Sequence, residues 1–243
     1  MNSHAVNSQT KTPLVDVRDL RYRFDNGVTA LNGIHFQLEA NHSVALLGPN
    51  GSGKTTFAHH LNGILRGSGY VAIGGLEVRD DNLAEIRRRV GIVFQDSDSQ
   101  LFMPTVLEDV AFGPLMRGHS KAEANERALD ALRLAGMSAL GERAPWQLSA
   151  GEKKRAALAG VLACEPELLV LDEPTTFLDP PGQRDFARLL ADLPQAKIII
   201  SHDTGFVRHL TEEAVFFWEG TIAARGPVAE IVQRYNWQVN EGP

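Results

Sequence analysis

A glycine-rich segment between a predicted strand and a predicted helix carries the clearest chemical signal in the sequence. It reads G-x-x-x-x-G-K-[ST] and directly follows the apolar run 43–47, which predicts a buried strand. Glycines let the backbone curl until successive N–H groups face one concavity, and a helix that starts there adds the positive end of its dipole. We therefore expect the phosphates of a nucleotide to bind along this segment, which consists of Gly48, Pro49, Asn50, Gly51, Ser52, Gly53, Lys54, Thr55 and Thr56.

Two adjacent carboxylates complement this phosphate loop. Asp172 and Glu173 directly follow the apolar run 168–171, and in parallel sheets the ligand binds beyond the carboxyl ends of the strands. Asp172 can hold Mg²⁺ or its waters together with the hydroxyl of Thr55, while Lys54 reaches the β- and γ-phosphates. Glu173 is the candidate general base that accepts a proton from an attacking water.

Two further predicted strands end in polar side chains. His202 follows the run 198–200, where a donor can stabilise charge on the γ-phosphate. Gln95 follows the run 90–94, and its side-chain carbonyl can contact Mg²⁺ or orient a water. The other seven of the eight histidines form no ligand spacing, so we expect no histidine metal site.

The segment from Ser149 to Glu152 is a literal S-x-x-E capping box at the start of a predicted helix over 151–164. Helix capping alone explains it. Gly151 in the first turn, however, also bares backbone amides, which with the helix dipole form an anion site. A single domain has no evident use for this second anion site.

The order of predicted elements indicates an α/β protein. Alternating short patterns over 14–37, with a turn at Asp25-Asn26-Gly27, predict antiparallel strands before the phosphate loop. The segment 104–146 predicts an inserted helical lobe. The fold class expected is an α/β P-loop NTPase core, a mostly parallel sheet with helices on both faces, plus the N-terminal antiparallel β subdomain and the α-helical subdomain. The remaining predicted elements are a helix ending near Asn62-Gly63, strands at 70–73, 90–94, 168–171 and 198–200, and helices at 121–134, 151–164 and 183–193.

Composition limits the classes of protein. The 243 residues carry a formal net charge of −6 and a pI near 5.8, which argues against a nucleic-acid partner. The basic clusters 87–89 and 153–155 are predicted to be solvated helix faces. A single cysteine, Cys164, fits a reducing cytoplasm. No apolar run is long enough to span a bilayer, and residues 1–12 predict a flexible tail rather than an export signal.

Taken together and in this order, the motifs resemble the ATP-binding cassette (ABC) family. The resemblance runs from about 14 to 235 and implies a single ABC ATPase domain over 13–243, with the helical subdomain inserted at about 96–148. The motifs are GPNGSGKTT at 48–56, Gln95, LSAGE at 148–152, LLVLDEP at 168–174, FLD at 177–179, and Ser201-His202-Asp203.

The resemblance implies roles beyond those read from single motifs. His202 becomes the γ-phosphate switch, and Phe24 the aromatic that stacks on adenine, with Tyr22 as the rival candidate. Ser149 and Gly151 would contact the γ-phosphate held by a second, facing subunit. Asp179 would lie at that interface. ATP and Mg²⁺ are the implied cofactors.

One position departs from the family pattern. Ala150 stands where the family usually has glycine, and its methyl group could weaken closure around the nucleotide. Gly151, the tighter position, is intact, so activity is expected to survive.

A finer resemblance comes from the segments 90–115 and 151–180. They are similar to the ATPase component of energy-coupling-factor importers, which bring cobalt, nickel or vitamins into prokaryotic cells. The implied partners are a second ATPase subunit, a membrane coupling protein and a substrate-binding membrane protein, at the cytoplasmic face of the membrane. Leu101 and Phe102 are apolar where a polar loop is expected. Either they line a groove for a helix of the membrane protein, or they fold back into the core.

Two other functions stay open at this stage. One is a non-transport ABC ATPase that acts on nucleic acid or ribosomes. It is disfavoured because 243 residues leave no room for a second cassette or a long coiled coil. The other is a nucleotide-sensing scaffold without turnover, which the intact Lys54, Glu173 and His202 disfavour.

Overall fold

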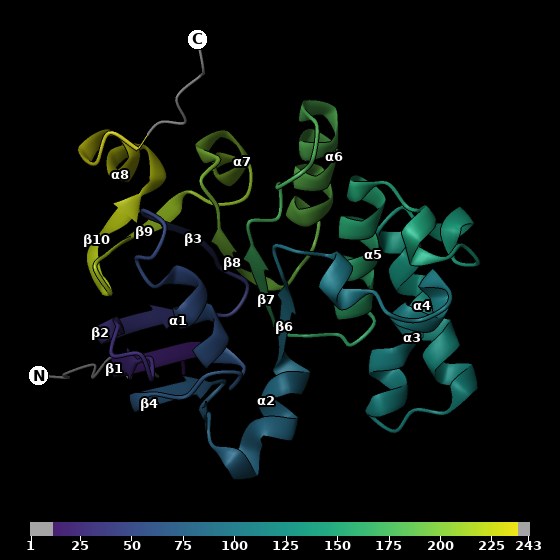
Figure 1. Cartoon of the computed structure of the whole chain (residues 1–243), viewed down its shortest axis with the longest axis horizontal. Coiled ribbons are helices and arrows are strands. Elements are labelled where there is room, and N and C mark those ends of the chain that lie inside the picture. Colours follow the sequence, from purple (N-terminus) through teal and green to yellow (C-terminus); the bar gives the residue numbers. More distant parts are fainter. Residues whose placement is uncertain (1–11, 238–243) are drawn as a thin grey trace, which may run out of the picture.

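The computed structural model describes residues 12–237, which form two sheets and a lobe of helices (Figure 1). The first sheet is antiparallel, with strand order β2-β1-β4-β5, and its first two strands form a hairpin. At the hairpin turn the N–H of Phe24 donates to the Val28 carbonyl at 2.9 Å, and Gly27 has φ +88°. The antiparallel strands predicted over 14–37 are therefore confirmed. The strands are β1 (Val15–Arg23), β2 (Thr29–Leu38), β4 (Ser68–Ile73) and β5 (Leu76–Glu77).

The second sheet has the order β10-β9-β3-β8-β7-β6 and is parallel except for its edge strand β10. Strands β7 and β8 are buried along their whole length, which explains their apolar runs 168–171 and 198–200. Because β8 lies between β3 and β7, the carboxyl ends of these three strands meet at one edge. The strands are β3 (Ser43–Leu47), β6 (Val90–Val93), β7 (Leu168–Asp172), β8 (Ala196–Ile200), β9 (Glu213–Trp218) and β10 (Thr221–Pro227).

The parallel sheet separates two hydrophobic cores. Side chains alternate across a strand, so Val44 and Leu46 of β3 belong to one core while Ala45 and Leu47 belong to the other. The first core also holds the antiparallel sheet and helix α1, and the second holds the helical lobe and the C-terminal helices. The helices outside the lobe are α1 (Lys54–Leu61), α2 (Leu83–Arg89), α6 (Pro180–Ala191), α7 (Thr204–Arg208) and α8 (Val228–Arg234).

The helical lobe lies beside β6 at the edge of the parallel sheet (Figure 1). Its helices are α3 (Val106–Met116), α4 (Lys121–Leu134) and α5 (Ala150–Leu162), and each begins with a complete capping box. The helix predicted at 121–134 is confirmed residue for residue. The predicted lobe over 96–148 encloses α3 and α4, and α5 packs on both of them.

Several features of the structure lie outside the predicted pattern. Helices α2, α7 and α8 and the strands β9 and β10 were not assigned as elements from the sequence. Of the predicted tail at 1–12, only Thr12 is among the described residues. Between residues 12 and 237 we find no helix with the length and apolar character needed to cross a membrane.

Candidate functional site

The phosphate loop connects β3 to α1 and can form only with glycine at two of its positions. Gly48 has φ +133° and Gly53 φ +105°, a backbone region that other residues rarely adopt. A Cβ atom at Gly48 would collide with the carbonyl oxygen of Phe217, and one at Gly53 with that of Ala30. The loop is thus wedged between β9 and β2.

Lys54, the first residue of α1, lies inside this loop. Its side chain is 6 % exposed, and its Nζ donates to the carbonyls of Gly48 at 2.7 Å and Pro49 at 2.9 Å. Burial lowers the pKa of the Lys54 ammonium, while the nearby Glu173 and Asp172 act in the opposite direction. A buried ammonium whose partners are neutral oxygens can exchange them for charged phosphate oxygens, which bind it more strongly.

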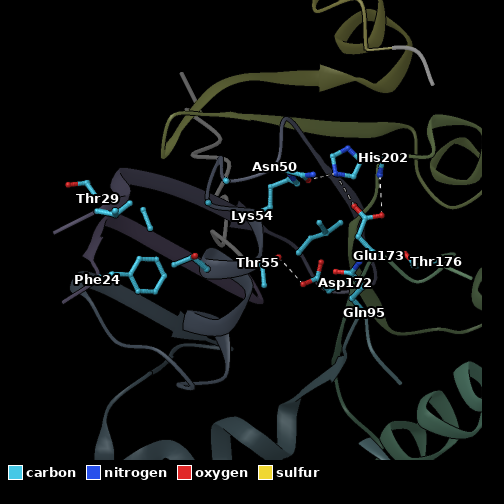
Figure 2. Close-up of a pocket in the computed structure, with 16 residues that line it drawn as sticks. Phe24, Thr29, Asn50, Lys54, Thr55, Gln95, Asp172, Glu173, Thr176 and His202 are labelled. Atoms are coloured by element: carbon cyan, nitrogen blue, oxygen red, sulfur yellow. Dashed lines mark hydrogen bonds and ion pairs between the residues drawn. The ribbon is translucent and has the colours of Figure 1, made fainter. Parts of the chain in front are cut away.

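Asp172 and Thr55 meet at the end of β7. The Thr55 hydroxyl donates to Oδ2 of Asp172 at 2.9 Å, and burial raises the pKa of that carboxyl. Gln95 lines the same pocket (Figure 2). The donors are hard oxygens, which fits Mg²⁺. No cluster of three or more His, Cys, Asp or Glu side chains that could cage a metal exists within residues 12–237, so these donors suit an ion that also binds phosphates.

Glu173 stands one residue beyond the strand in a left-handed conformation, with φ +44°. Its side chain is 16 % exposed, and its Oε1 atom is buried without a hydrogen-bond partner among the described residues. Burial raises the pKa of Glu173 to about 7; the adjacent Asp172 adds to this effect, and a backbone N–H from His202 opposes it. A carboxylate with a pKa near the working pH is suited to accept a proton from water.

His202 lies on the loop that follows β8. Its Nε2 is 2.9 Å from Oδ1 of Asn50 in the phosphate loop and 3.3 Å from Oε1 of Glu173 (Figure 2). Burial lowers the pKa of His202 and Lys54 lowers it further, while Asp172 acts in the opposite direction, so the neutral imidazole is favoured near pH 7. A neutral imidazole with a proton on Nε2 can donate to a phosphate oxygen.

Of the two aromatic residues expected to stack on adenine, only Phe24 lines the cavity. Phe24 is 38 % exposed and lines the pocket beside Val28, Thr29 and Ala30. Tyr22 is not part of the pocket wall; its ring packs edge-on against Phe24 at 5.0 Å and against His60 at 4.9 Å. Of the two, Phe24 therefore has the access to stack on a base, and Tyr22 supports it from behind.

One cavity of about 560 Å³ collects most of the residues expected to bind nucleotide, a size typical of small-molecule sites. Gly48, Pro49 and Ser52 belong to the loop but not to the cavity wall. The expected residues that line the cavity are Phe24, Asn50, Gly51, Gly53, Lys54, Thr55, Thr56, Gln95, Asp172, Glu173 and His202.

Ser149 and Gly151 do not contribute to this cavity, because they lie at the start of α5 in the helical lobe. Ser149 is exposed, and the capping box is complete. The Ser149 Oγ accepts from the N–H of Glu152 at 3.3 Å, and the Glu152 carboxylate accepts from the Ser149 N–H at 2.8 Å.

Lys154 corrects one prediction. The cluster 153–155 was expected to be a solvated helix face, yet Lys154 is only 2 % exposed and its Nζ donates to the carbonyls of Phe94 and Gln95. Burial lowers the pKa of Lys154, and Asp172 opposes that shift. The signal that could have found it is helical spacing, because the side chains three and four positions later, Ala157 and Leu158, are buried core.

The fold and this cavity define a P-loop nucleotide hydrolase. A phosphate loop, an oxygen set for Mg²⁺, a carboxylate with raised pKa and a neutral histidine meet at the carboxyl edge of a parallel sheet.

Comparison with known proteins narrows this class. The family model described as "ABC transporter" matches residues 31–176. The energy-coupling factor transporter ATP-binding protein EcfA of Methanothermobacter thermautotrophicus is 45 % identical over 90 % of this chain and 72 % of its own. The chain therefore belongs to the ABC transporter family and is an ABC ATPase.

Solved structures agree with this assignment. CbiO1 of Clostridium perfringens, part of the ABC transporter complex CbiONQ, superimposes with a TM-score of 0.83 at 34 % identity, covering 92 % of each chain. A dimeric ATP-binding cassette in a post-hydrolysis state, bound to ADP and Pi, has a TM-score of 0.77 at 27 % identity and covers 88 % of this chain and 98 % of its own. The expected fold class is thus confirmed, and so is an ATPase similar to the energy-coupling-factor and cobalt type.

Proposed function

We propose that the chain is the ATP-hydrolysing subunit of an energy-coupling-factor-type importer at the cytoplasmic face of the membrane, and that the cargo is cobalt, nickel or a vitamin. The similarity to EcfA and to CbiO1 supports the type of transporter. The observation that carries the enzymatic part is the placement of Glu173, with a pKa of about 7, between the phosphate loop and His202.

ATP binding begins with the phosphate loop. Lys54 gives up the carbonyls of Gly48 and Pro49 and donates to the β- and γ-phosphates, while Phe24 stacks on the base. Thr55, Asp172 and Gln95 would hold Mg²⁺, which supplies charge neutralisation on the phosphates when bound.

Hydrolysis then uses the strand-end groups. Glu173 takes a proton from the water whose oxygen bonds to the γ-phosphorus, while the bond from this phosphorus to the bridging oxygen breaks and ADP leaves. His202 turns its Nε2 from Asn50 towards the γ-phosphate oxygen. The neutral state of the His202 imidazole leaves one proton on the ring for this donation. No residue of this cavity forms a covalent intermediate in this scheme.

The second anion site at the start of α5 completes the proposal. Ser149 and Gly151 lie outside the nucleotide cavity of their own chain. We therefore propose that they contact the γ-phosphate bound by a second ATPase subunit in a closed dimer. The similarity to a dimeric ATP-binding cassette supports this arrangement. Whether the second subunit is the same chain does not affect the geometry of one composite site.

The surface after Gln95 is the proposed contact with the membrane coupling protein. Phe102 is 63 % exposed and packs edge-on against Phe112 at 5.0 Å, whereas Leu101 is partly buried on the lobe core. Asp109 fixes this loop, because its carboxylate accepts from the N–H groups of Phe102 and Met103. Of the two apolar residues, Phe102 is therefore the one that can enter a contact with a partner helix.

Two variants test the proposed partner surface. Phe102→Ser is expected to abolish transport in vesicles containing the membrane partners. ATP binding by the isolated chain is expected to stay within about twofold, because Phe102 is exposed and does not line the nucleotide cavity. Leu134→Ser, which changes another exposed apolar side chain of the same lobe, serves as the control. Unchanged transport with Phe102→Ser would place the docking surface elsewhere.

The cargo is tested by co-purifying the chain with its membrane partners and measuring ATP-dependent uptake of cobalt, nickel and vitamins into vesicles. Cargo that accumulates only with hydrolysable ATP supports an importer. ATP-dependent release from preloaded vesicles would contradict the direction of transport.

The non-transport alternative gains no support from the structure. Its discriminating feature was a long coiled coil in the helical lobe, and the longest helix of the lobe, α4, has 14 residues. A helix of this length suits local packing within one lobe.

A further inference from the structure

Trp237, an aromatic side chain outside all the nucleotide-binding motifs, lies against His202. The centroids of the Trp237 and His202 rings are 5.6 Å apart and their planes are inclined by 34°, within the range of about 4.5–7 Å in which aromatic rings interact. His202 thus has two kinds of contact. Its Nε2 is near Asn50 and Glu173, and its ring packs on the indole.

The backbone fixes Trp237 at this place. Helix α8 ends at Arg234, and Asn236, two residues further on, has the left-handed conformation at φ +48°. The N–H of Asn236 donates to the Gln233 carbonyl at 3.2 Å, and the N–H of Trp237 donates to the Val232 carbonyl at 2.8 Å. This pair of bonds is a Schellman motif, which sets the direction of the chain after a helix. The position of the indole is therefore determined by the end of α8.

The indole is also supported by the strand next to the phosphate loop. Trp237 packs edge-on against Phe216 of β9 at 5.5 Å, and the Phe216 ring is only 1 % exposed and stacks flat on Tyr235 at 3.8 Å. Phe216 is paired with Leu47, the last residue of β3 before the phosphate loop. Trp237 and the phosphate loop are consequently held by the same rigid part of the sheet.

We propose that Trp237 is a positioning residue for His202: it limits the rotamers of the imidazole to those in which Nε2 faces the phosphate loop and Glu173, the side on which the γ-phosphate would bind. The His202 side chain is 40 % exposed, so without the indole its ring would have open space into which to turn. Every turn away from the phosphate removes the donor from the reacting group. The proposal rests on the proposed role of His202 in hydrolysis.

Steady-state kinetics provides the first test. Trp237→Ala is expected to lower kcat about fivefold to tenfold and to change the KM for ATP by less than about twofold, because the donor is misplaced while the phosphate loop is intact. Trp237→Phe keeps a ring at the same place and is expected to retain most of kcat. Trp218→Ala is the matched control, because Trp218 also stacks on Phe216, at 6.5 Å, without touching His202.

Fluorescence provides a readout that a purely structural role of Trp237 would not move. The chain has three tryptophans, so Trp146→Phe together with Trp218→Phe leaves Trp237 as the only indole. Its emission depends on the neighbouring imidazole. A non-hydrolysable ATP analogue is expected to change this emission when His202 turns to the γ-phosphate, and ADP is expected to change it less. Adding His202→Ala is expected to abolish the difference between the two nucleotides.

The outcomes separate this inference from the proposed function. A kcat for Trp237→Ala equal to that of Trp218→Ala overturns the positioning role, and so does a nucleotide-dependent emission change that persists with His202→Ala. An inactive His202→Ala beside a fully active Trp237→Ala would leave the proposed role of His202 in place and overturn only the role of Trp237. Full turnover by His202→Ala would overturn both.

Discussion

The two regions proposed to enclose ATP differ in how far their polar groups are satisfied. Around the phosphate loop, Lys54 is buried with only neutral oxygens of the loop as hydrogen-bond partners, and Glu173 Oε1 is buried with no hydrogen bond among the described residues. At the start of α5, Ser149 is exposed, and its capping box with Glu152 is complete.

This difference shows why one region reveals its chemistry and the other does not. Buried groups without good partners cost free energy, and a ligand that supplies the missing partners recovers it. The region around the phosphate loop therefore indicates a ligand from its own geometry. A satisfied, exposed helix start is a stable cap in one chain and becomes a binding element only when a second chain brings a phosphate to it.

The largest expected effect tests the region around the phosphate loop. Glu173→Gln should keep ATP binding and lower kcat by about 10²-fold or more, because the amide preserves the shape but cannot accept a proton. Turnover is measured by phosphate release and binding by equilibrium titration. Lys54→Ala is the contrasting variant, since it should weaken binding itself. Wild-type turnover with Glu173→Gln would remove Glu173 from the role of base.

The next effect tests the helix start. Lys54→Ala and Ser149→Arg homodimers are both expected to be inactive, because each lacks one half of every composite site. Mixing them in equal amounts should restore about a quarter of wild-type activity, since half of the dimers carry one intact site of two. Phosphate release is measured against the mixing ratio. Full activity of the Ser149→Arg homodimer would reduce Ser149 to a helix cap.

A smaller effect follows from the pKa of Glu173. Because this pKa is raised to about 7, Glu173 is protonated and inactive as a base below that pH and ionised above it. The value of kcat/KM should therefore rise with pH and be about tenfold lower at pH 6 than on the plateau at pH 8 and above. Nucleotide affinity measured at the same pH values is the control. A flat profile between pH 6 and 8 would contradict the raised pKa.

The smallest expected effect concerns Ala150, the first residue of α5, which is exposed. If its methyl group lies at the interface with the second nucleotide, Ala150→Gly should raise ATPase activity at limiting ATP by about twofold and lower stability by less than about 1 kcal/mol, the usual difference in helix propensity. ATPase titrations and thermal unfolding check the two parts. A loss of activity would place the methyl group in a stabilising contact.

The parts of the fold that the sequence predicted share strong local signals. The phosphate loop has its glycines, the capping box at Ser149 starts α5, and α4 spans 121–134 as expected. The apolar runs 168–171 and 198–200, which precede Asp172 and His202, are typical of buried parallel strands. Their carboxyl ends therefore could be placed at one edge before the structure was known.

The parts that were missed depend on contacts between distant segments. The residues of strand β10 alternate between partly buried and exposed, and none is fully buried, so the sequence shows no strong apolar alternation. The strand forms through its antiparallel pairing with β9. From its residue type, Lys154 is expected at the surface. Its burial is explained only by the hydrogen bonds to the carbonyls of Phe94 and Gln95, which are distant in the sequence. The position of Trp237 beside His202 depends on the turn at Asn236. Asparagine favours such a left-handed turn after a helix, but the local sequence does not show that the turn brings Trp237 to His202.

The order of strands in the parallel sheet also has a consequence for synthesis. Strand β3 lies between β8 and β9, and Ala45 pairs with Ala214 near the other end of the chain. Pairing of such high sequence separation forms late, after the C-terminal strands have left the ribosome. Because the turn at Gly48 is wedged against Phe217 of β9, the phosphate loop acquires its shape only at that stage. A nascent chain that stops before β9 is therefore expected to remain unable to capture nucleotide, however completely its hairpin and helical lobe have folded.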